Sequence, residues 1–243
     1  MVRFVKLTAL LVWGLSAFAL HGEEIPEQKA MQLLPLSDDV WLHLSYKQVD
    51  GFGLVESNGV IILSEQGSII IDTPWTEQDT AELLNWAAAR GMPVTTSFSS
   101  HSHEDRTAGI GLLNSKGIDT HASKMTNAIL EKQGKPLAKQ EITGTSYALA
   151  EGVEVFYPGP GHAPDNSVVW LAGANILVGG CLIRSAETDS LGYTGDASPE
   201  EWGPSVQKVL ARYPEAKIVL PGHGLPGTRA LLHHTISLTE GGS

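Results

Sequence analysis

The sequence has little cysteine, an excess of acidic over basic residues, and no long apolar run beyond its first residues. Cys181 is the single cysteine among 243 residues, so the chain can form no internal disulfide. The 27 acidic residues outnumber the 16 basic ones, and the net charge of −11 argues against nucleic acid or an anionic membrane as a partner. With 42% hydrophobic residues, the chain suits one compact domain with a sizeable core.

The first 19 residues have the pattern of a signal peptide. Arg3 and Lys6 supply the positive start, residues 7–15 form an apolar run, and Ala17 and Ala19 give an A-x-A cleavage site. An uncleaved membrane anchor is the alternative, but the apolar run is shorter than the ~20 residues that a span needs. We therefore predict a signal peptide over 1–19, cleaved near Ala19, export to the periplasm, and a single domain over 20–243 with no membrane insertion.

Hydrophobic periodicity and turn residues predict two similar halves. Strands are expected at 40–46, 53–55, 60–63, 68–71, 93–100, 118–121, 153–157, 167–171, 175–178 and 217–220, with turns at Asn58-Gly59 and Gln66-Gly67. Helices are expected from a capping box at 76–79 to Gly91, at 107–115, at 123–133, from Ser198 to Ala211, and at 228–238. Two mixed sheets packed face to face, with helices on both outer sides, would bury these apolar faces.

The stretch from His101 to Asp105 has the residue types of a zinc site. Two histidines at i and i+2, in a turn that leaves a strand, can converge on one ion, and Asp105 can reach a neighbouring position. A polar surface loop is the alternative for this stretch alone, because a zinc site needs further ligands. The decision therefore rests on the rest of the chain.

Three further candidate ligands follow predicted strands later in the chain. His162 lies in a loop rich in glycine and proline, Cys181 follows a strand that ends in Gly179-Gly180, and His223 lies in a P-G-H-G loop. A small buried side chain is the usual alternative for a lone cysteine. The sequence predicts two sites with three protein ligands and an open position each, as in catalytic zinc sites: His101, His103 and His162 for the first, and Asp105, Cys181 and His223 for the second.

The chain resembles the class B metallo-β-lactamases in the order and spacing of its motifs. These motifs are the signal peptide, the H-S-H-E-D-R stretch, the P-G-P-G-H loop, the G-G-C strand end and the P-G-H-G loop. The resemblance covers roughly residues 33–238 and is closest to the subclass whose second zinc is held by Asp, Cys and His. The wider superfamily usually has a second histidine and a bridging Asp where this chain has Arg106 and Cys181. The resemblance implies an α/β fold, an αββα sandwich of two mixed sheets, with two zinc ions per chain in a cleft along one edge.

The resemblance also implies an activity. The protein is expected to be a β-lactam amidohydrolase that hydrolyses penicillins, cephalosporins and carbapenems and confers antibiotic resistance. A hydroxide on the first zinc would attack the lactam carbonyl without a covalent intermediate, and the second zinc would stabilise the leaving nitrogen. The alternatives are a thiolester or lactone hydrolase of the same fold and a non-catalytic periplasmic zinc-binding protein. The partner is a small β-lactam, and the chain is expected to be a monomer.

Several other residues match positions of the family. Arg184 matches the cation that pairs with the β-lactam carboxylate, Phe52 the tip of a mobile loop that closes over substrate, and Tyr193 stands where many members have an asparagine near the carbonyl oxygen. The expected catalytic residues are therefore Asp105, Arg184 and Tyr193, and the expected substrate-binding residues are Arg184, Phe52 and Tyr193. Asp72 and Arg106 are expected to support the metal site without binding the ions.

Overall fold

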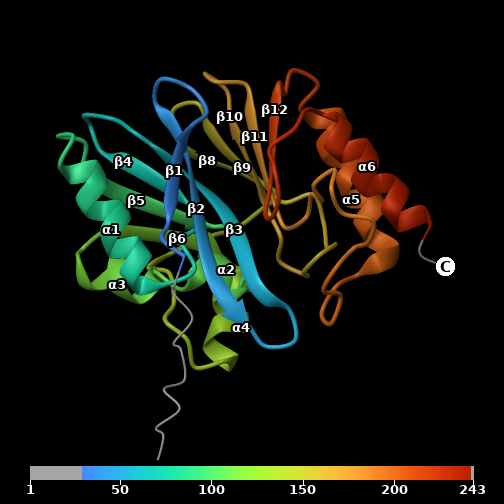
Figure 1. Cartoon of the computed structure of the whole chain (residues 1–243), viewed down its shortest axis with the longest axis horizontal. Coiled ribbons are helices and arrows are strands. Elements are labelled where there is room, and N and C mark those ends of the chain that lie inside the picture. Colours follow the sequence, from blue (N-terminus) through green and yellow to red (C-terminus); the bar gives the residue numbers. More distant parts are fainter. Residues whose placement is uncertain (1–28, 242–243) are drawn as a thin grey trace, which may run out of the picture.

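The computed structural model describes residues 29–241 as two β-sheets packed face to face, with helices on both outer sides (Figure 1). The predicted αββα sandwich of two mixed sheets is therefore confirmed. The predicted signal peptide lies outside the described residues. Within 29–241, no helix combines the length and the apolar character that crossing a membrane requires.

The first sheet takes its seven strands in chain order. They are β1 (Gln32–Pro35), β2 (Val40–Val49), β3 (Gly53–Ile62), β4 (Ser68–Ile71), β5 (Val94–Ser99), β6 (Asp119–Ser123) and β7 (Gln140–Ile142). The pairings from β1 to β4 are antiparallel and those from β4 to β7 are parallel. The carboxyl ends of β4 to β7 therefore lie along one edge of the sandwich.

The second sheet has the order β12-β11-β10-β9-β8. Its strands are β8 (Ser146–Ala150), β9 (Val153–Phe156), β10 (Val168–Leu171), β11 (Ile176–Gly180) and β12 (Ile218–Pro221). Only β11 and β12 pair in parallel, which brings their carboxyl ends side by side. The core between the sheets joins Val60 and Phe98 of the first sheet to Val169 and Val178 of the second.

Helices cover the outer face of each sheet (Figure 1). The first sheet carries α1 (Glu77–Ala88), α3 (Ile110–Ser115) and α4 (Lys124–Lys132), and the second carries α5 (Pro199–Arg212) and α6 (Ala230–Glu240). The short helix α2 (Glu104–Thr107) lies at the edge of the sandwich, shortly after β5. Leu83 of α1 and Leu113 of α3 join Ile70 in one buried cluster, while Val206 of α5 joins Leu177 in another. The apolar faces of these helices therefore pack on the outer faces of the two sheets.

The predicted turn at Asn58-Gly59 is wrong, because β3 runs unbroken through both residues. A Cβ atom on Gly59 would lie 2.6 Å from the carbonyl oxygen of Asp72 and closer still to the ring of His43. The glycine therefore allows two buried groups to approach the strand and does not mark a turn. The predicted cap at Thr76 is confirmed, since its side chain accepts a hydrogen bond from Asp79 N, whereas the Ser198 side chain makes no cap hydrogen bond.

Candidate metal centre

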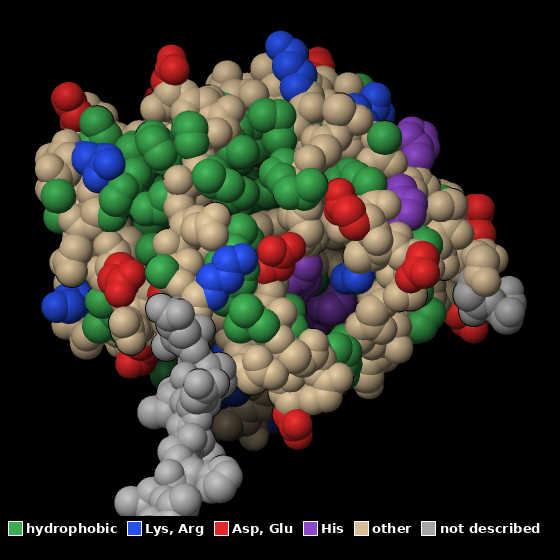
Figure 2. Space-filling model, in the orientation of Figure 1, with side chains coloured by type: hydrophobic (Ala, Val, Ile, Leu, Met, Phe, Trp, Pro, Cys, Tyr) green, Lys and Arg blue, Asp and Glu red, His purple; other side chains and the backbone are tan. Residues whose placement is uncertain are grey.

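All six predicted metal ligands lie together at one edge of the sandwich. His101, His103 and Asp105 follow β5, His162 lies in the loop after β9, Cys181 follows β11, and His223 follows β12. Four of them, His103, Asp105, His162 and His223, line a cleft of about 700 Å³. The other two, His101 and Cys181, are buried next to them. Figure 2 shows histidine side chains at the bottom of a hollow on this face. Their role as ligands stays a prediction that the geometry supports.

The first donor set consists of three imidazoles that converge on one point. His103 Nδ1 lies 3.1 Å from His101 Nε2 and 3.0 Å from His162 Nε2. Zn–N bonds of ~2.0–2.1 Å in a tetrahedron separate two ligand nitrogens by about 3.3 Å, so this spacing fits one zinc ion. Burial, aided by the neighbouring His103, lowers the pKa of His162 to about 3, which keeps this imidazole neutral as a metal ligand must be.

The second donor set joins an imidazole, a thiol and a carboxylate. His223 Nε2 lies 3.3 Å from both Cys181 Sγ and Asp105 Oδ2, and these last two atoms are 3.6 Å apart. Tetrahedral zinc with bonds of ~2.3 Å to sulfur and ~2.0–2.1 Å to nitrogen or oxygen would give edges of about 3.5 Å and about 3.3 Å. The set therefore fits a second zinc ion, and its sulfur ligand favours zinc over harder cations.

The two donor sets are neighbours. His101, Asp105 and Cys181 offer ligand atoms that all lie within 4.8 Å of one another, although His101 belongs to the first set and the other two to the second. Burial opposes protonation of His223, but the sulfur of Cys181 and the carboxylate of Asp105 raise its pKa to about 10. Zinc binding in the second set must therefore displace a proton from His223.

Three of the four ligand histidines have a fixed orientation. Their outward ring nitrogens meet polar partners: Ser100 Oγ for His101 Nδ1 at 3.1 Å, Asp196 Oδ2 for His103 Nε2 at 2.9 Å, and the Glu56 carbonyl for His223 Nδ1. Such partners fix the tautomer and the direction of the ring. Asp196 was not predicted from the sequence, because it lies 93 residues from its histidine, in a turn before α5.

Arg106 contacts the second donor set from the protein interior. Its fully buried guanidinium has Nη2 2.8 Å from Asp105 Oδ2 and 3.1 Å from Cys181 Sγ, and it donates a 2.9 Å hydrogen bond to the Gly222 carbonyl. Burial favours the neutral acid, but the Arg106 charge holds the pKa of Asp105 well below its usual value. Gly222 is needed here, because a Cβ atom would lie 2.5 Å from Cys181 Sγ. These contacts match the supporting role expected for Arg106.

Asp72 supports the first donor set through Ser100. Its carboxylate accepts hydrogen bonds from Ser100 N at 2.7 Å and from Ser100 Oγ at 3.0 Å, and it lies 3.5 Å from Arg106 Nη1. Since Ser100 Oγ also contacts His101 Nδ1, polar contacts connect Asp72 to a predicted metal ligand. Burial raises the pKa of Asp72, and Arg106 opposes that shift.

The predicted substrate-binding residues line the same cleft. Phe52 is 65% exposed at the tip of the β2–β3 hairpin, which borders the cleft. The Tyr193 ring lies edge-on to the His103 ring with 6.0 Å between centroids. The guanidinium of Arg184 lies beside Gly192, and its Nε has no hydrogen-bond partner among residues 29–241. The structure thus brings these three side chains to the metal cleft, and their roles stay predictions.

Two adjacent sets of three candidate ligands, at one edge of an αββα sandwich and open to a cleft, form the arrangement that is typical of binuclear metallohydrolases. The profile of the metallo-β-lactamase superfamily matches residues 52–223. The chain belongs to that superfamily.

Named relatives agree with this assignment. A type 2 metallo-β-lactamase of Pseudomonas aeruginosa is 40% identical over 95% of this chain and 92% of its own length. The structure of the metallo-β-lactamase DIM-1 superposes with a TM-score of 0.87 at 45% identity, covering 89% of this chain and 100% of that one. The structure of TMB-1 gives a TM-score of 0.86 at 46% identity, covering 87% and 98%.

Proposed function

We propose that this protein is a zinc-dependent β-lactamase that hydrolyses the amide bond of penicillins, cephalosporins and carbapenems, and so confers antibiotic resistance. The observation that carries the proposal is the pair of adjacent donor sets on the floor of one cleft, with Arg184 in its wall. The relatives named as metallo-β-lactamases, one of them solved after exposure to ceftazidime, support the same activity.

Six side chains of this chain would hold two zinc ions: His101, His103 and His162 the first, and Asp105, Cys181 and His223 the second. Bound zinc supplies a water acidic enough to be a nucleophile near pH 7 and a Lewis acid that polarises a carbonyl oxygen. The protein contributes a fixed arrangement of donors, because Asp72, Arg106 and Asp196 hold the ligands from outside.

The walls of the cleft would orient the substrate. The Arg184 fork can bind the β-lactam carboxylate through two hydrogen bonds, which places the lactam ring over the donor sets. The exposed Phe52 ring can cover apolar substituents and exclude water. The Tyr193 phenol, whose ring lies edge-on to His103, can donate a hydrogen bond to the carbonyl oxygen. The buried Cys181 sulfur points into the second donor set, so it is not available as a covalent nucleophile.

The enzyme would act in the periplasm as a monomer. The charged, apolar and A-x-A segments of residues 1–19 support export and cleavage near Ala19. The single thiol is buried in the described structure, so it is protected in an oxidising compartment. The side chains of both donor sets come together within one chain, so the site needs no residue from a second copy.

Hydrolysis assays test the proposal. The purified protein would be mixed with a chromogenic cephalosporin and with a carbapenem, before and after chelation, and zinc would be measured on the same sample. We expect turnover that is lost on chelation and restored by zinc. His162→Gln should lose most of that activity, whereas His121→Gln, a matched change in β6 away from the donor sets, should keep it.

Two results would contradict the proposal. Turnover that survives complete removal of metal would exclude the zinc mechanism. Two bound zinc ions without turnover of any β-lactam would leave the metal site in place and reject the substrate, and thiolesters and lactones would then be assayed on the same sample.

A further inference from the structure

A free edge of β3 holds the loop that carries His223. On its side away from β2, β3 pairs with β4 only over residues 60–62. Before residue 60, that edge of β3 pairs with no other strand among residues 29–241. The P-G-H-G loop, residues 221–224, lies there instead, and Asn58 N donates a 2.9 Å hydrogen bond to the Gly222 carbonyl. The backbone of β3 therefore serves the loop as it would serve a neighbouring strand.

Glu56 contacts this loop through two different groups. Its backbone carbonyl accepts a hydrogen bond from His223 Nδ1, the ring nitrogen that faces away from the second donor set. Its carboxylate Oε1 accepts a 3.0 Å hydrogen bond from Gly224 N. A hydrogen bond from a backbone N–H to a carboxylate is stronger than one to a neutral acceptor. One residue of β3 therefore fixes both the imidazole ring and the main chain that follows it.

The main chain at Gly224 makes the second contact important. Gly224 has a φ of +83°, which favours glycine, and a Cβ atom there would lie 2.3 Å from Ser185 Oγ. Glycine gives the main chain its greatest freedom, so a hydrogen bond at this residue restricts the turn directly after the ligand. Among residues 29–241, the Glu56 carboxylate is the acceptor for this N–H.

The Glu56 side chain does not line the metal cleft, whereas its neighbour Val55 and the ligand candidate His223 do. It is therefore placed to act on the ligand and not on a substrate. We propose that Glu56 is a positioning residue for the second zinc: its carboxylate holds the turn at Gly224, so that His223 Nε2 stays where the ion of the second donor set binds. This inference rests on the proposed zinc ligands and not on the identity of the substrate.

Cobalt(II) binding to the metal-free protein tests the proposal without any β-lactam. A cobalt ion bound by Cys181 gives a thiolate charge-transfer absorption in the near ultraviolet, and the first donor set holds no sulfur, so the signal reports the second set alone. We expect Glu56→Ala to raise the free cobalt concentration at half-maximal signal ~10-fold or more, as is typical when a residue that orients a metal ligand is removed.

Two conservative variants separate position from charge. Glu56→Gln keeps the length of the side chain and an acceptor oxygen, so it should restore most of the affinity that Glu56→Ala loses. Glu56→Asp keeps the charge but is one methylene shorter, so its carboxylate should not reach Gly224 N. We therefore expect its cobalt affinity to lie near that of Glu56→Ala.

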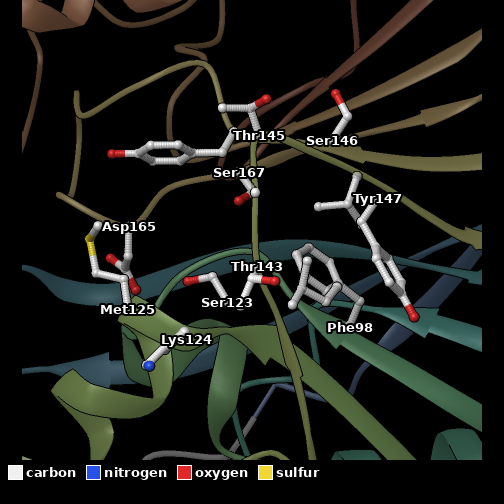
Figure 3. A pocket seen from close by; sticks show the side chains of 14 residues that line it. Phe98, Ser123, Lys124, Met125, Thr143, Thr145, Ser146, Tyr147, Asp165 and Ser167 are labelled. Carbon is white, nitrogen blue, oxygen red and sulfur yellow. The ribbon is translucent and has the colours of Figure 1, made fainter.

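Control variants change charges away from the P-G-H-G loop. Glu65→Ala makes the same change at an exposed position between β3 and β4 and should leave the cobalt titration unchanged. Lys124→Ala shifts the net charge in the opposite direction, at a second cavity of about 310 Å³ that shares no lining residue with the metal cleft (Figure 3). It should also leave the titration unchanged, since net charge alone does not place His223.

Three outcomes would overturn the proposal. An unchanged titration in Glu56→Ala would show that His223 is placed without the carboxylate. If Glu56→Gln bound cobalt as weakly as Glu56→Ala while Glu56→Asp kept the wild-type affinity, the charge would act without positioning the loop. A wild-type protein without a thiolate signal would overturn the second donor set and this proposal together. A protein that hydrolyses no β-lactam can still give the expected titration, so failure of the proposed substrate is distinguishable.

Discussion

Removal of the Arg106 side chain should weaken both the fold and the second zinc site. The guanidinium has no exposed surface and meets four polar groups in addition to Asp72: the carboxylate of Asp105, the sulfur of Cys181, and the carbonyl oxygens of Asn58 and Gly222. Loss of one partner of a buried ion pair costs ~3–5 kcal/mol, because the other charge stays buried without compensation. At ~2–4 °C per kcal/mol for a chain of this size, Arg106→Ala should lower Tm by roughly 6–20 °C.

Two measurements follow from these contacts. Thermal unfolding of the zinc-loaded variant gives Tm, and competition with a chromogenic chelator gives the affinity of each zinc. Residues that position metal ligands typically contribute ~10–100-fold to metal affinity. We expect the zinc of the second donor set to lose affinity by that factor while the other ion is retained, because Arg106 contacts two of the predicted ligands of that set.

Conservative and control variants sharpen this test. Arg106→Lys keeps the charge but replaces the planar fork by one ammonium, so its loss of Tm should be smaller than that of Arg106→Ala. Lys217→Ala removes an exposed cation just before β12 and should change Tm by no more than ~2 °C. The reasoning is refuted if Arg106→Ala keeps the wild-type Tm and both zinc affinities.

Three further predictions concern the second zinc, the substrate and pH. Cys181→Ser should weaken the second zinc and strongly reduce hydrolysis, and unchanged zinc content and rate would remove Cys181 from the site. Arg184→Ala should mainly raise KM for carboxylate-bearing β-lactams, so an unaltered KM across several of them would reject its role. Burial lowers the pKa of His43 from 6.5 to about 3. Between these pH values the unfolded chain binds a proton at His43 and the folded chain does not, so the free energy of unfolding decreases as pH falls below 6.5. Between pH 6.5 and 5 this loss is about 1.6 kcal/mol. In urea unfolding, His43→Gln should lack this pH-dependent loss, whereas the exposed control His233→Gln should keep it.

The local signals in the sequence predicted most of the sandwich. The Thr76 cap, the strand before His101 and the strand before His223 all fall where turn chemistry and apolar runs place them. The ligand set could be predicted as well, because each candidate follows a strand end and only a few residue types bind zinc well. The sequence therefore predicted which six side chains meet at one edge of the sandwich, and their role as ligands stays a prediction.

Contacts between distant segments were not visible in the sequence. Asn58-Gly59 has the residue types of a turn, but Gly59 lies within β3. The glycine leaves space there for the His43 ring and the Asp72 carbonyl oxygen. The strands β1, β7 and β8 lie at or near sheet edges and are largely exposed, so they lack the apolar alternation that marks a strand. Asp196 contacts His103 through a loop, and no periodicity connects the two residues.

X-ray absorption at the zinc edge, combined with activity on the same samples, tests the central claim most directly. Metal-free protein would be titrated with zinc while hydrolysis of a chromogenic cephalosporin is followed. We predict that activity requires zinc and that each chain binds two ions. At two equivalents of zinc, the mean coordination per ion should be two imidazoles and half a sulfur, because four histidines and one cysteine bind two ions. Full activity without zinc, or two bound ions with no zinc–sulfur contribution, would contradict the account.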